Sequence, residues 1–105
     1  EVLGAMEDME MICFKIISAV GEAKSDYISA IEAAKKGDFD KAEEAMKHGA
    51  ACYVNGHKEH AGLISREASG EKTDACLLLL HAEDQLMAAE TIKLLASELI
   101  ELYKK

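Results

Sequence analysis

The chain has 105 residues, half of them hydrophobic, and contains no proline and no tryptophan. This length suits a single domain spanning residues 1–105, and the hydrophobic content argues against a disordered chain. The net charge of -8 argues against nucleic acid or an anionic membrane as partner, because no basic stripe is available to replace counterions. A basic patch on another protein is the more suitable partner for so acidic a chain.

The cysteine pattern indicates the compartment. Cys13, Cys52 and Cys76 are widely spaced and form no C-x-x-C motif, which predicts reduced thiols and a cytoplasmic location. The longest apolar run, residues 75–80, is far shorter than the ~20 residues that cross a bilayer. The first residues carry acids rather than the basic start of a secretory signal, so we expect no direct insertion into a membrane.

Residues 1–36 are predicted to form one long helix, because their apolar residues recur at intervals of three and four. This stripe consists of Val2, Met6, Met9, Cys13, Ile16, Ile17, Val20, Tyr27, Ile28, Ile31 and Ala34. Gly37 and Asp38 then predict a turn, since glycine suits the left-handed residue after a helix and aspartate suits the cap of the next.

Residues 39–65 are predicted to form a second helix with a stripe of mostly small residues, which a neighbouring helix can approach closely. The stripe consists of Ala42, Ala45, Met46, Gly49, Cys52, Tyr53 and Gly56, and Leu63 and Ile64 complete it. The polar residues 66–72 predict the second turn.

A third helix is predicted to begin at a cap formed by Thr73 or Asp74 and to continue to about residue 103. One face carries Leu77, Leu80, Met87, Leu94 and Leu95, and the predicted solvent arc carries Glu83, Glu90, Lys93, Ser97 and Glu101. The apolar part exceeds what two neighbouring helices can cover. We therefore predict an all-α, antiparallel three-helix bundle that buries the surplus by closed self-association.

The most informative residues lie on this third helix. Asp84 falls within the apolar face, where an ionised carboxylate is costly unless it is paired, metal-bound or protonated. His81 lies three residues before Asp84 and four before Gln85, so the three side chains can be neighbours. A neutral imidazole can attack a phosphoryl group without an elaborate activating base, which makes phosphohistidine chemistry the favoured hypothesis.

A metal-binding bundle is an alternative, since His57 and His60 share one helix face beside Glu59. No H-E-x-x-H motif occurs, and no histidine has a glutamate three residues before it, as a di-iron bundle would require. The sequence also contains no G-x-S-x-G and no phosphate-binding glycine loop.

The segment His81-Ala82-Glu83-Asp84-Gln85-Leu86-Met87 resembles the H-A-Q-D-H-L-M signature of the lactose/cellobiose-specific IIA proteins of the bacterial phosphotransferase system. Residues 21–25, 37–39, 57–64, 66–71 and 98–103 also resemble segments of that family, in the same order. Among them, Gly21-Glu22-Ala23-Lys24-Ser25 is similar to the family's G-[DQ]-A-R-S.

The resemblance implies a homotrimer of three-helix protomers and a phosphotransferase-system component that acts as a phosphohistidine carrier. His81 would be phosphorylated by phospho-HPr, the phosphate donor, and would pass the group to the IIB component during uptake of a lactose- or cellobiose-type disaccharide. Asp84 would lie at the trimer axis, where a divalent cation such as Mg²⁺ can hold three carboxylates. Gln85 does not match the family signature, but its side chain can donate a hydrogen bond to the phosphate, although it cannot carry positive charge.

Three positions depart from the family pattern. Glu83 replaces the usual glutamine, Gln85 replaces a second histidine, and His60 stands where glutamine is common. Glu83 adds negative charge beside a site that must accept a dianion. These departures motivate the alternative of a regulatory or scaffold trimer with weakened or lost phosphotransfer.

Overall fold

The computed structural model describes the backbone of residues 2–105 and the side chains of residues 8–105. The first residues of the predicted stripe, Val2 and Met6, have side chains outside this described part. The described chain forms three α-helices, α1 (Val2–Lys35), α2 (Phe39–Ala68) and α3 (Leu77–Tyr103), and no strand is assigned within it. The predicted all-α, three-helix fold is therefore confirmed.

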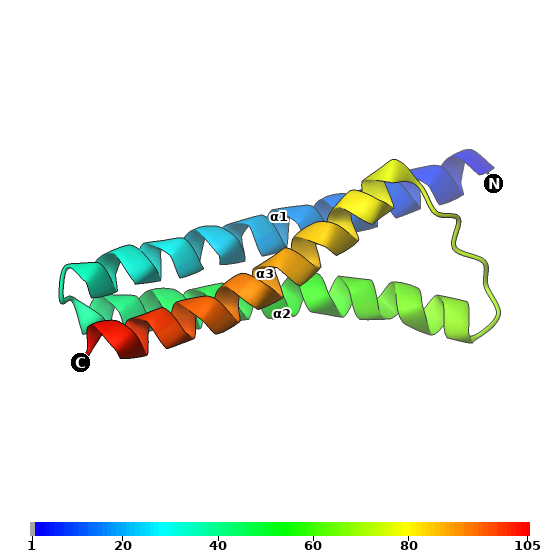
Figure 1. The fold of residues 1–105 in the computed structure, drawn as a ribbon. Coiled ribbons are helices and arrows are strands. Elements are labelled where there is room, and N and C mark those ends of the chain that lie inside the picture. Colours follow the sequence, from blue (N-terminus) through cyan, green and yellow to red (C-terminus); the bar gives the residue numbers. More distant parts are fainter. Residues whose placement is uncertain (1) are drawn as a thin grey trace.

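The helices form an elongated bundle of 55 × 21 × 19 Å. In Figure 1, α1 and α2 run antiparallel, and α3 crosses over them and ends near the turn that joins them. α3 packs chiefly against α1 and only slightly against α2.

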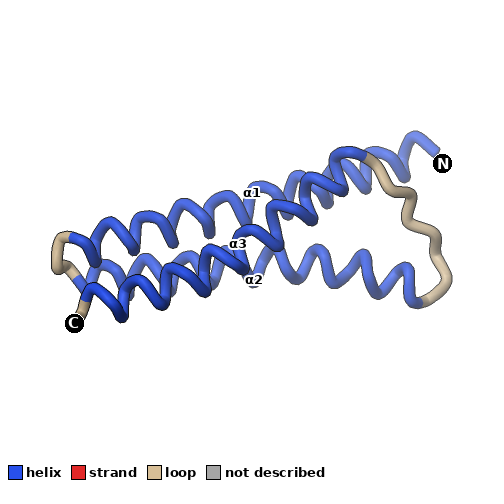
Figure 2. The backbone as a smooth tube through the Cα atoms, viewed as in Figure 1, coloured by secondary structure: helices blue, strands red, loops and turns tan. Residues whose placement is uncertain are grey.

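The tight turn between α1 and α2 follows the sequence prediction. Gly37 adopts φ +80°, a left-handed conformation that L side chains rarely adopt, and this ends α1. Asp38 then caps α2, because its side chain accepts a hydrogen bond of 3.2 Å from the Lys41 backbone N–H. The loop on the left of Figure 2 is this turn.

The second connection lies later in the chain than predicted. α2 continues to Ala68, because residues 66–68 favour helix, and the chain turns at Gly70 with φ +98°. α3 begins at Leu77 and not after Thr73 or Asp74. Its cap is Cys76, whose extended backbone stops the helix from starting earlier and whose Sγ accepts from the Leu79 N–H at 3.4 Å.

The core is built from the predicted stripes of α1 and α2 and from an inner face of α3 that the sequence pattern did not single out. This face consists of Leu79, Ala82, Leu86, Ala89, Ala96 and Ile100, all buried. Ile28 and Ile64, which were placed on the inner stripes, are 52% and 58% exposed, so both assignments were wrong for a single chain.

Two glycines bring α2 close to α1. A Cβ on Gly49 would lie 2.6 Å from Cε1 of Tyr27, and a Cβ on Gly56 would lie 2.7 Å from Cγ1 of Val20. Tyr27 and Val20 are fully buried, so neither can move aside freely. The predicted close approach of the small-residue stripe is confirmed at these two positions.

Gly49→Ala is expected to lower the free energy of unfolding by about 1–3 kcal/mol, because the added methyl group overpacks the buried Tyr27 ring. Gly62→Ala is the matched control, since no atom lies within 4 Å of its Cβ position and alanine favours helix by up to ~1 kcal/mol. Chemical denaturation of the two variants measures both changes. Equal effects would contradict the close-packing explanation.

Candidate functional site

The predicted site residues lie on α3, near the end where the second connection enters it. His81 is the fifth residue of α3 and is exposed. Asp84 is exposed and Gln85 is half-buried. One helical turn separates His81 from each of them, so the sequence expectation that the three lie close together holds for the backbone.

Gln85 contacts a residue from another helix. The Nζ of Lys24 on α1 donates a hydrogen bond to Oε1 of Gln85. Because an ammonium group can only donate, this contact assigns the amide oxygen to Lys24 and leaves the Gln85 NH₂ group free to donate elsewhere. The contact places a positive charge one turn from His81.

Sequence reasoning did not assign Lys24 to the site. The partners are 61 residues apart in the chain, and only the packing of α3 on α1 joins them. The signal available in the sequence is the segment of residues 21–25, which resembles the family's G-[DQ]-A-R-S.

Glu83, which was predicted to lie on the solvent arc, has a side chain that is 43% exposed and directed toward α2. Its Oε1 lies 3.8 Å from Nε2 of His60, and the His60 side chain is only 18% exposed. The two departures from the family pattern, His60 and Glu83, are therefore neighbours across the contact between α2 and α3.

Asp84 interrupts an exposed apolar face. Leu80 and Met87, one turn to either side, are 58% and 59% exposed. The face consists of Leu77, Leu80, Met87, Leu94, Leu95 and Leu102, each more than half exposed. An apolar strip of this length on a single helix is typical of an interaction surface.

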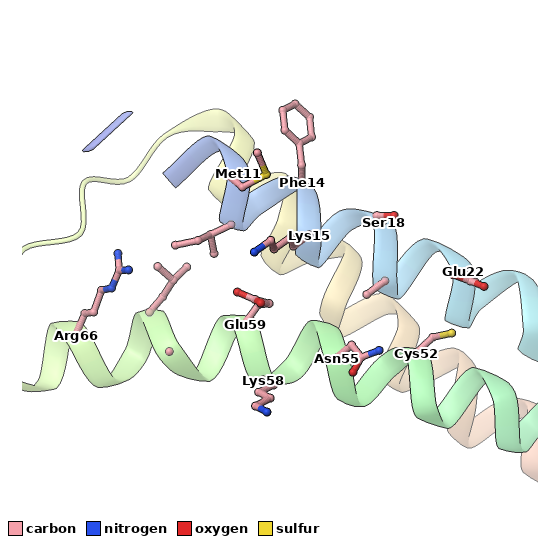
Figure 3. Close-up of a pocket in the computed structure, with 14 residues that line it drawn as sticks. Met11, Phe14, Lys15, Ser18, Glu22, Cys52, Asn55, Lys58, Glu59 and Arg66 are labelled. Carbon is pink, nitrogen blue, oxygen red and sulfur yellow. The ribbon is translucent and has the colours of Figure 1, made fainter. Parts of the chain in front are cut away.

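The alternative metal site at His57, His60 and Glu59 is not assembled. The His57 ring lies beside Tyr53, with ring centroids 6.0 Å apart, while His60 faces Glu83. Glu59 instead lines a groove of about 830 Å³ between α1 and α2. Figure 3 shows that its side chain extends into this groove, toward α1.

The groove is separate from the predicted site. Its lining comes from α1 and α2, and His81, Asp84 and Gln85 are not part of it. Lys15, Asn55 and Arg66 are among its polar residues, and Glu22 and Cys52 lie at one end (Figure 3).

Comparison with known proteins identifies the class of this bundle. The sequence model of the family "PTS system, Lactose/Cellobiose specific IIA subunit" matches residues 11–104. The chain therefore belongs to the lactose/cellobiose-specific IIA family of the phosphotransferase system, as its motifs predicted.

Individual relatives agree with this assignment. The chain is 44% identical over 99 residues to the lichenan-specific phosphotransferase enzyme IIA component of Bacillus subtilis, covering 94% of this chain and 90% of the relative. It is 36% identical to the lactose-specific EIIA component of Staphylococcus epidermidis, covering 94% and 95%.

A solved structure confirms the fold. The crystal structure of the cellobiose-specific enzyme IIA from Bacillus anthracis superposes with a TM-score of 0.88 at 42% identity, covering 90% of this chain and 86% of that one. No helix in the described part of the chain is long and apolar enough to span a membrane.

Proposed function

We propose that this chain is a cytoplasmic phosphoryl carrier that accepts phosphate from phospho-HPr on His81 and passes it to a IIB component. The transport system it serves would import a β-linked disaccharide of the lactose or cellobiose class. The observation that carries the proposal is the exposed His81 one turn from the Lys24–Gln85 contact, in a chain of the IIA family. An exposed imidazole can meet the two partner proteins in turn.

The transfer follows from the roles of these groups. A neutral imidazole nitrogen of His81 attacks the phosphorus of phosphohistidine, the new N–P bond forms, and the donor imidazole leaves. The NH₂ group of Gln85 is available to donate to a phosphoryl oxygen, and the Lys24 ammonium offsets its negative charge. Catalysis is then mainly positioning and electrostatics.

His81→Ala is expected to abolish phosphorylation, because no other residue would supply the nucleophile. Intact-mass measurement after incubation with enzyme I, HPr and phosphoenolpyruvate should show one added phosphoryl group on the wild type and none on the variant. His57→Ala, which removes another exposed histidine, should keep the mass gain. A wild-type chain that gains no mass would overturn the proposal and favour the regulatory trimer.

Lys24→Met is expected to slow phosphoryl transfer by about 10- to 100-fold. This loss is smaller than that caused by removing a buried oxyanion donor, because Lys24 is only half-buried and solvent screens its charge. Lys24→Arg should retain most of the rate. Lys15→Met is the matched control, since Lys15 lies on α1 but lines the separate groove. The measurement is the single-turnover rate from phospho-HPr, and equal rates for Lys24→Met and Lys15→Met would exclude a role for Lys24.

A homotrimer is proposed from the outer face of α3. Exposed residues recur along this face at alternating intervals of three and four: Leu77, Leu80, Asp84, Met87, Thr91, Leu94 and Glu98. This heptad spacing is that of a coiled-coil seam, in which polar residues at seam positions help to fix register and the number of strands. Three copies of α3 would bury the leucines against one another.

Asp84 is the residue suited to a cation in such an assembly. It is a single carboxylate between two exposed apolar turns, so burial of this face brings three carboxylates together and requires compensating charge. Carboxylate oxygens suit a hard divalent cation such as Mg²⁺, which would supply that charge. The ion would then serve assembly, while His81 at the edge of the same face carries the chemistry.

Met87→Glu is expected to separate the protomers, because an unpaired buried charge costs about 3 kcal/mol and raises the dissociation constant more than about 100-fold. Ser97→Glu is the control on an exposed part of the same helix. Sedimentation analysis gives the mass of each variant. In the same assay, chelation should weaken the wild-type assembly but not Asp84→Asn, and a wild type that sediments as a monomer would exclude the trimer.

A further inference from the structure

A second group of chemically reactive side chains lies away from α3. Glu22 and Asp26 are four residues apart on α1, and His48 and Cys52 are four apart on α2, so each pair shares one helix face. The close contact at Gly49 brings the pairs together, since a Cβ on Gly49 would lie 3.1 Å from Cβ of Asp26. None of these residues has a role in the function proposed above.

The distances within this cluster suit a metal. One ligand atom each from Glu22, His48 and Cys52 lie within 4.8 Å of one another. Sγ of Cys52 lies 3.8 Å from Nδ1 of His48, close to the roughly 3.5 Å edge of a tetrahedral zinc site with bonds of 2.0–2.3 Å. Nδ1 of His48 is also 2.6 Å from Oδ2 of Asp26, so a metal ion bound at Nδ1 would replace this hydrogen bond.

We propose that Glu22, His48 and Cys52 bind a transition-metal ion of the zinc class, with the Asp26 carboxylate beside them and one coordination position left for water. A thiolate, an imidazole and a carboxylate are the donor set of tetrahedral zinc sites. The thiolate and imidazole also disfavour magnesium and calcium, which prefer oxygen. This site therefore differs in both place and chemistry from the carboxylates proposed at Asp84.

The surroundings support a cation at this position. Glu22 and Asp26 place two carboxylates at this position, and Oδ2 of Asp26 lies 2.6 Å from Nδ1 of His48. A divalent ion bound here would offset part of their negative charge.

The proposed ion links two helices. Two ligands come from α2 and one from α1, so bound metal would hold α1 and α2 together beside the Gly49 contact. Metal that binds only the folded chain stabilises it by mass action, so zinc should raise the unfolding temperature.

Cobalt(II) added to the reduced, metal-free protein is the direct test. One equivalent should bind, with the intense absorption of a thiolate–cobalt bond, and zinc should displace it. Cys52→Ser should remove that absorption, and His48→Ala should weaken cobalt binding by more than the roughly 10- to 100-fold that loss of an outer-shell partner costs. Asp26→Asn removes a neighbouring charge but no ligand, so it should weaken cobalt binding less than His48→Ala does.

Matched controls separate this site from the other candidates. Cys76→Ser removes another exposed thiol, and His57→Ala another exposed histidine, and both should bind cobalt as the wild type does. Asp84→Asn should also keep the thiolate absorption. Circular dichroism verifies that each variant is folded. As a second readout, bound zinc should protect the Cys52 thiol from an alkylating reagent.

The proposal is overturned if the folded wild type binds cobalt without thiolate absorption. It is also overturned if Cys76→Ser, rather than Cys52→Ser, removes that absorption, or if His48→Ala binds cobalt as tightly as the wild type. None of these results bears on His81, because His81 is not among the proposed ligands and the phosphorylation assay measures the mass added at His81, not cobalt binding.

Discussion

The backbones of α1 and α2 lie close together because two glycines of α2 place no side chain between them. Gly49 receives the ring of Tyr27, and Gly56 receives Val20. The resulting two-helix layer fixes the surface on which α3 packs, and hence the position of Lys24 next to Gln85. It also sets Glu22 and Asp26 opposite His48 and Cys52.

α3 uses its two apolar faces differently. Its inner face is rich in alanine, with Ala82, Ala89 and Ala96 seven residues apart, and this lets it lie close to α1. The leucines of its outer face remain exposed on the single chain. A continuous apolar face of α3 thus remains exposed after the protomer has folded, and His81 lies at the edge of that face. One helix in this way combines packing, assembly and chemistry.

The sequence predicted the fold class, the first turn and the small-residue stripe of α2, since periodicity, glycine and capping aspartate each act locally. It did not predict the inner face of α3, because leucines on both sides of a helix give no single stripe. The sequence also did not predict that Glu83 contacts His60 or that Lys24 contacts Gln85. Such contacts depend on how helices are rotated against each other, which spacing along one helix does not determine.

The two connections hold the helices in different ways. Gly37 and Asp38 join α1 to α2 in a short, tight turn, so the length of this turn sets the register of the two helices. Residues 69–76 instead span an open stretch, seen on the right of Figure 2, and the register of α3 is set by its side chains. Doubling the length of a flexible loop costs only about 0.6 kcal/mol. The chain can therefore vary in length between Gly70 and Cys76 while His81 keeps its position.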